Sequence, residues 1–128
     1  MKRVAILSCR NAGQVCAGVS CLQAFFERDG SFAAYGEEPL RLTAFLQCNG
    51  CQGVEDQGPF DQGTFRPLRE DAGMLKKLDR MEREGVEIVH LGICCWNRAG
   101  EICPWVAELK EELQRRGMEV VKGTHRHG

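Results

Sequence analysis

Four short apolar runs alternate with longer segments of helical spacing, and this alternation is the feature that most constrains the fold. The runs lie at 3–8, 40–47, 86–92 and 118–121. Each is short and continuous, which is typical of strands covered on both faces of a parallel sheet. The pattern therefore predicts an α/β domain with a doubly wound, mainly parallel four-stranded sheet of strand order 2-1-3-4.

Three segments between these strands have the periodicity of amphipathic helices. They run from about residue 19 to Asp29, from Met74 to Gly85 and from Pro104 to Gly117. The glycines are typical helix stops, and proline suits the first turn of a helix. Residues 31–39 fit a packed connection better than an element of their own. The result is a three-layer arrangement of the Rossmann or flavodoxin-like type.

The segment 49–73 stands apart from this pattern because it contains five glycines and two prolines and has no sustained period. It is about twice the length at which a loop without secondary structure becomes unusual in a compact domain. Phe60 and Phe65 favour a lid docked on the domain over a disordered loop.

Length and charge limit the domain count and the partners. A chain of 128 residues is enough for a single domain over 1–128 with a core of its own. Charged residues make up 27% of the chain and the formal net charge is -1, which offers no broad attraction for nucleic acid or an anionic membrane. No apolar span reaches about 18 residues, and none at the N-terminus suits a signal peptide. The expected location is the cytoplasm.

Eight cysteines are many for a chain of this size. In a reduced cytoplasmic protein, such a number indicates metal binding or thiol catalysis more than disulfides. Cys48 and Cys51 form a Cys-x-x-Cys pair directly after the second predicted strand, a spacing that lets two thiols bind one metal ion.

The parallel topology predicts that several of these thiols meet. Cys9, Cys48 and Cys94 each come just past the end of a different strand, and the segment 123–125 follows the fourth. Ligands of doubly wound sheets bind at that edge. The predicted metal ligands are Cys9, Cys48, Cys51, Cys94, Cys103 and His125, with Cys16 and Cys21 as additional candidates.

The chain also resembles the CGGC-domain proteins, a group of proposed metal-binding proteins. The matching stretches cover nearly the whole chain, from the strand that ends in Cys9, through Cys16–Cys21, Cys48/Cys51, Cys94 and Cys103, to the closing Gly123-Thr124-His125. The resemblance implies zinc or another soft metal and implies no substrate. Asn49 stands where the family pattern has glycine, which suggests a turn that tolerates a left-handed residue.

Three readings of the thiols stay open. The first is a zinc-binding protein, with an iron-sulfur cluster or another soft metal as the alternative cofactor. The second is a thiol-disulfide oxidoreductase that uses Cys48 and Cys51, although no helix follows the pair to acidify a thiol. The third is an interaction module in which the cysteines are core residues. His90, within the third strand, is interpreted as a hydrogen-bonded core residue.

Overall fold

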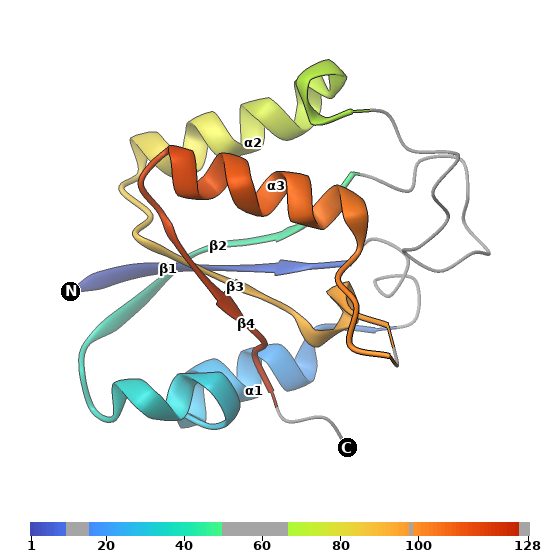
Figure 1. The fold of residues 1–128 in the computed structure, drawn as a ribbon. Coiled ribbons are helices and arrows are strands. Elements are labelled where there is room, and N and C mark those ends of the chain that lie inside the picture. Colours follow the sequence, from blue (N-terminus) through green and yellow to red (C-terminus); the bar gives the residue numbers. More distant parts are fainter. Residues whose placement is uncertain (10–15, 50–66, 98, 126–128) are drawn as a thin grey trace.

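The computed structural model describes residues 1–9, 16–49, 67–97 and 99–125 (Figure 1). Its four strands form one parallel sheet in the order β2-β1-β3-β4, so the predicted α/β class and strand order are confirmed. The strands are β1 (Lys2–Ser8), β2 (Leu40–Gln47), β3 (Ile88–Leu91) and β4 (Glu119–Lys122).

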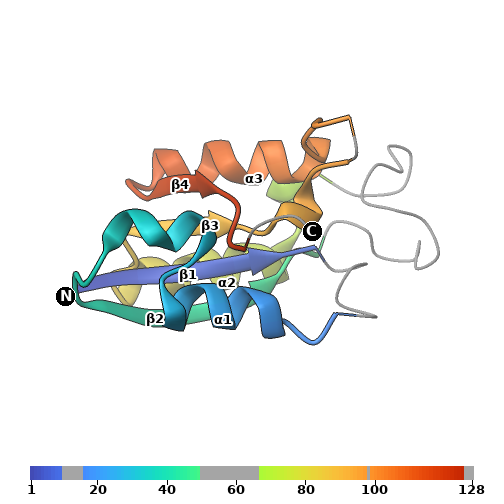
Figure 2. The same cartoon turned by 90° about the horizontal axis from the view of Figure 1, so that it is seen from below.

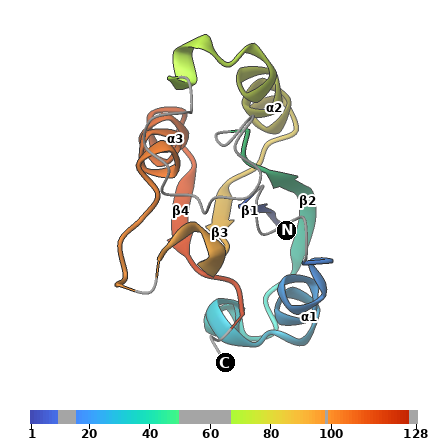
Figure 3. The same cartoon turned by 90° about the vertical axis from the view of Figure 1, so that its right-hand side faces the viewer.

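Helices cover both faces of this sheet. The α-helices are α1 (Val19–Glu27), α2 (Ala72–Arg83) and α3 (Pro104–Arg115), and three short 3-10 helices are η2 (Gly30–Tyr35), η3 (Leu68–Glu70) and η4 (Ile93–Cys95). Viewed toward the carboxyl ends of the strands, α2 and α3 lie above the sheet and α1 and η2 below it (Figure 3). Figure 2 shows the lower layer, with α1 and η2 in front of the sheet.

The core is divided between these two faces. The α2/α3 face buries Ala5 and Leu7 of β1 with one side of both helices, whereas the α1/η2 face buries Val4 and Ile6 with Phe25 and its neighbours. Alternate residues of β1 thus serve opposite layers, as the continuous apolar run predicted. Burial on both sides explains why the strand carries no polar residue between Val4 and Leu7.

Strand β2 contains a bulge at Thr43. Val4 pairs with Leu42 and Ala5 pairs with Ala44, so Thr43 has no partner on β1. Before the bulge, Leu40 and Leu42 pack with the α1/η2 face, and beyond it Ala44 and Leu46 pack with the α2/α3 face. One extra residue therefore exchanges the two faces of the strand.

Element η2 was not predicted. Its residues show no helical period, yet Phe32 is fully buried and lies edge-on to Phe25, with ring centroids 5.4 Å apart. The expectation that residues 31–39 form a packed connection and no element of their own was therefore wrong for their first half. A six-residue 3-10 helix that contributes one aromatic ring to the core is too short to give a sequence period.

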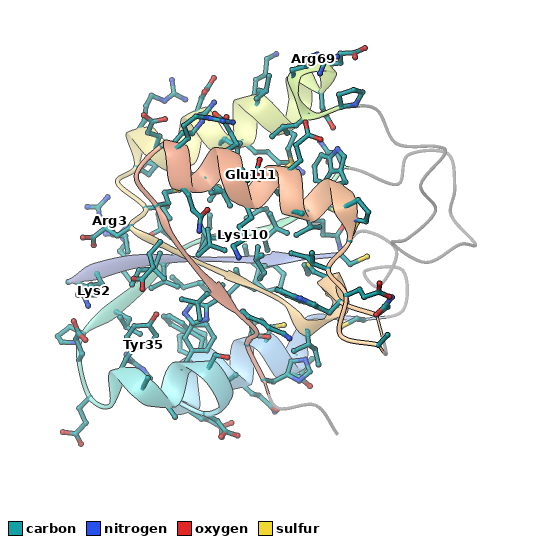
Figure 4. All side chains as sticks on the ribbon, in the orientation of Figure 1. Lys2, Arg3, Tyr35, Arg69, Lys110 and Glu111 are labelled. Atoms are coloured by element: carbon teal, nitrogen blue, oxygen red, sulfur yellow. The ribbon has the colours of Figure 1, made fainter. Side chains whose placement is uncertain are left out.

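His90 is a hydrogen-bonded core residue, as interpreted from the sequence. Its side chain is fully buried and stacks on Phe32 at a centroid distance of 4.0 Å. Nδ1 lies 3.0 Å from the carbonyl oxygen of Gly123 and Nε2 lies 2.8 Å from the hydroxyl of Tyr35. A carbonyl only accepts, so Nδ1 carries the proton and Nε2 accepts from Tyr35. Figure 4 shows Tyr35 in the lower layer.

The burial of His90 predicts a loss of stability in mild acid. Burial lowers the pKa of His90 below its ordinary 6.5, against a smaller opposing effect of the Gly123 carbonyl. Below pH 6.5 the unfolded imidazole binds a proton that the folded one does not, so stability falls from there toward the lowered pKa, by at most about 1.4 kcal/mol per pH unit. Denaturant unfolding between pH 7.5 and 5 should show this decline in wild type and in His125→Ala, and a flatter profile in His90→Gln. Equal slopes in all three proteins would contradict the assignment.

Among the helices in the described ranges, none has the length and apolar character needed to cross a membrane.

Candidate functional site

Cysteines follow the carboxyl ends of three neighbouring strands. Cys9 comes directly after β1, Cys48 directly after β2, and Cys94 lies in η4 just past β3. Because all strands are parallel, these positions share one edge of the sheet. Lys2 and Arg3 mark the opposite edge, at the start of β1 (Figure 4).

Most thiols at this edge are buried. We call the four cysteines whose residues are at most 2% exposed the buried thiol group: Cys9, Cys48, Cys95 and Cys103. Backbone hydrogen bonds fix their places, because Cys48 N–H donates to the Ser8 carbonyl at 3.0 Å and Cys103 N–H donates to the Cys95 carbonyl at 2.9 Å. Cys103 is the N-cap of α3, and the helix begins at Pro104, as the sequence predicted.

Hydrogen bonds to its sulfur favour the ionised form of Cys94. Its sulfur accepts a hydrogen bond from the Cys95 thiol and a second, at 3.1 Å, from the backbone N–H of Cys9. The Cys95 hydrogen bond lowers the pKa of Cys94 to about 7, with the Cys9 amide adding to the effect and burial opposing it. The lowered pKa favours the thiolate of Cys94, the form that binds metals.

The neighbouring thiols keep their protons. Donation to Cys94, with burial, raises the pKa of Cys95. Burial raises the pKa of Cys103, although the first amides of α3, at Val106 and Trp105, oppose it. A charge on Cys48 would raise the pKa of Cys94, Cys95 and Cys103 alike, which indicates that these sulfurs lie near one another. Four closely spaced thiols cannot all ionise unless a cation joins them.

The start of the Cys-x-x-Cys segment is tied to α2 by the side chain of Asn49. Lys77 Nζ donates to the Gln47 carbonyl at 2.9 Å and to Asn49 Oδ1 at 3.0 Å, and Asn49 Nδ2 donates to Asp71 Oδ1 at 3.4 Å. Among the described residues other than glycine, Arg28 alone has a positive φ. The suggestion of a left-handed turn at Asn49 was therefore wrong, and its side chain acts as a bridge between Lys77 and Asp71.

A cavity of about 140 Å³ opens beside Cys94, between the strand ends and the start of α1. Its walls combine thiols and an imidazole with polar groups of the strands and two large apolar side chains. The lining residues are Ser8, Cys16, Ala17, Gly18, Cys21, Phe45, Gln47, Ile93, Cys94 and His125. A volume equal to several water molecules is enough for a metal ion and a small ligand.

Two further cysteines belong to this cavity. Cys21, in the first turn of α1, is 6% exposed, and its sulfur lies 3.1 Å from Oγ1 of Thr124. Burial raises the pKa of Cys21 and the Thr124 hydrogen bond partly offsets that rise. Cys16 is exposed at the wall, and its sulfur accepts from the Gly18 N–H at 3.4 Å.

The structure thus divides the predicted ligands into two groups that meet at Cys94. The buried thiol group contains Cys9, Cys48 and Cys103, and the cavity wall contains His125, Cys16 and Cys21. Cys51 lies outside the described residues. Sequence reasoning missed Cys95, although its position directly after Cys94, past a strand end, was a usable signal.

The donor set fits a soft metal ion, because thiolates and imidazole suit zinc, copper(I) and iron-sulfur clusters. The donor side chains are not arranged as a metal site among the described residues. Within residues 1–9, 16–49, 67–97 and 99–125, no three Cys, His, Asp or Glu side chains converge closely enough to hold an ion.

Comparisons with known proteins give one match. The family model of the CGGC domain covers residues 3–125. Neither the curated proteins nor the solved structures contain a match to the chain.

Proposed function

The chain belongs to the CGGC-domain family, which is generally metal-binding, and from this premise we propose that it binds a soft metal ion, zinc, at the carboxyl edge of the sheet. The donors that the edge offers are thiols and an imidazole, which suit such an ion.

The position of Cys94 is the observation that supports this proposal most. Its sulfur contacts the buried thiol group through Cys9 and Cys95 and also forms part of the cavity wall that includes His125. An ion bound by Cys94 would be reachable from solvent through the cavity and held by protein ligands on its other side. A thiol with a pKa near 7 also gives up its proton to a metal at little cost at neutral pH.

The ligands that we propose are Cys9, Cys48, Cys51, Cys94, Cys103 and His125, with Cys16 and Cys21 as additional candidates. A tetrahedral ion uses at most four of them. The cavity beside Cys94 favours three protein ligands and one open position, the coordination of sites that bind water or a substrate. In such a site His125 would coordinate the ion or accept a proton from a bound water.

Thiol-disulfide exchange is the second candidate, and the lowered pKa of Cys94 favours it. The thiol of Cys95, which is hydrogen-bonded to Cys94, is a poor disulfide partner. Adjacent residues have Cα atoms about 3.8 Å apart, below the range of about 4.4–6.8 Å that ordinary disulfides span. Cys94 and Cys95 are therefore better suited to share a proton or a metal than to form a disulfide.

Elemental analysis of protein purified without air tests the proposal. We expect about one zinc ion per chain in wild type and an empty site in the double variant Cys48→Ser/Cys51→Ser, since both thiols are proposed ligands. Iron with brown visible absorbance would point to a cluster instead. Full zinc occupancy in the double variant would contradict the assignment of this pair, and a metal-free wild type would contradict metal binding itself.

A further inference from the structure

The chain segment 123–125, which carries His125, is docked closely on the lower layer of the fold. Gly123 N–H donates to the Leu91 carbonyl at 2.6 Å and the Gly123 carbonyl accepts from His90. One residue later, the Thr124 carbonyl accepts from the Ser31 N–H at 2.9 Å. Figures 1 and 3 show the end of β4 running beside η2.

Close approach to η2 depends on Gly30. A Cβ atom at this position would lie 2.3 Å from the Thr124 carbonyl oxygen and 2.9 Å from Cα of His125, both backbone atoms. Contacts under about 3.0 Å between such atoms do not occur, so any side chain here would push the segment away. Glycine also tolerates the φ of +55° found at this residue.

Thr124 links this docking to the cavity. Its residue is fully buried, and its hydroxyl lies against the sulfur of Cys21, which lines the cavity as His125 does. The side chain of Thr124 therefore faces one wall residue, and the next residue along the chain is another. A shift of the backbone at Thr124 would move His125 relative to Cys21 and Cys94.

We propose that Gly30 and Thr124 are positioning residues, which hold the His125 imidazole in the cavity wall and thereby raise the affinity of the site for metal. This inference rests on the proposed function. A terminal segment that is not docked must lose backbone freedom when one of its side chains binds an ion. Fixing the backbone of one residue costs a free energy that corresponds to about a tenfold change in affinity. Release of the segment should therefore lower zinc affinity on the order of tenfold.

The chain offers a matched glycine pair for the test. Gly30 has a φ of +55° and Gly36, just beyond η2, has a φ of +56°, but a Cβ at Gly36 would meet nothing within 4 Å. Gly30→Ala and Gly36→Ala therefore both place an alanine at a positive φ, and Gly30→Ala alone creates the clash with the segment. Thr124→Val keeps the shape of the side chain and removes its hydroxyl, as a milder second variant.

Two measurements on these variants separate positioning from metal binding. In metal-free protein, the ¹⁵N order parameter of the His125 amide should be near about 0.85 in wild type and Gly36→Ala and fall below about 0.6 in Gly30→Ala. In chelator competition, zinc affinity should fall about tenfold in Gly30→Ala, less in Thr124→Val, and not in Gly36→Ala. In the His125→Ala background, Gly30→Ala should cause no further loss, because the two changes act through one imidazole.

An unchanged order parameter in Gly30→Ala, or an equal loss of zinc affinity with and without His125, would overturn the positioning role. The failure of the proposed function looks different. Wild type would then bind no zinc, while the order parameter of His125 would still report whether Gly30 and Thr124 hold the segment in place.

Discussion

Cys94→Ser is expected to lower zinc affinity by more than about 100-fold, since changes to groups that merely orient ligands already cost about 10- to 100-fold. Serine keeps the size of the side chain but is neither ionised at neutral pH nor a soft donor. Cys94 also lies where the buried thiol group meets the cavity. A neighbouring thiol could replace it as a ligand only if the buried thiol group and the cavity wall both moved. Competition with a chromophoric chelator at pH 7.5 measures the change.

Cys21→Ser is the matched comparison, because Cys21 lines the same cavity but contacts Thr124. We expect a smaller loss there. Thermal unfolding of both metal-free variants should stay near that of wild type, since serine preserves the shape of each site. Zinc affinity of Cys94→Ser within threefold of wild type would remove Cys94 from the ligands and place the site elsewhere on the edge.

Phe32→Ala is expected to cost about 3–5 kcal/mol of stability, a large share of the roughly 5–15 kcal/mol of a typical domain. The ring of Phe32 is fully buried, meets Phe25 edge-on and stacks on His90. Its removal leaves a cavity between η2 and the sheet that the short helix cannot close. Urea unfolding of the metal-free protein at pH 7.5 measures the loss.

Phe26→Ala is the control for this change, because it removes the same ring from a residue that is 70% exposed. Its cost should stay within about 0.5 kcal/mol, as is usual for surface positions. Similar losses in the two variants would mean that η2 is not part of the core, and the packing described for the lower layer would be wrong.

The strand order and the helices could be predicted because each has a local cause. The apolar run of β1 has to be buried on both faces, Pro104 is tolerated in a helix only in the first turn, and the alternation of strands and helices permits few topologies. The helix η2 was missed for the opposite reason. A single ring at the end of a short connection becomes a core residue only through the partners that the tertiary structure supplies, His90 and Phe25.

For the site, the sequence could predict which edge of the sheet carries the thiols, but not the hydrogen bonds that their side chains make there. Parallel pairing alone places Cys9, Cys48 and Cys94 together at the strand ends. Which thiol ionises depends on a hydrogen bond from Cys95 and on the direction of the Cys9 amide, and neither has a sequence pattern. The side-chain role of Asn49 was equally hidden, because its partners come from a helix more than twenty residues away.

The bulge at Thr43 determines which residues of β2 face the α1/η2 layer and which face the α2/α3 layer. Leu40, Leu42, Ala44, Leu46 and Cys48 alternate regularly along the sequence, and in an unbroken strand all five would face α1. Thr43 interrupts the alternation, so that Cys48 packs with Cys95 and Cys103 while Phe45 turns into the cavity wall. A relative of this chain that lacked Thr43 would keep the Cys48 thiol on the α2/α3 face, whereas one that kept the residue and paired without a bulge would present the same cysteine to the α1 layer.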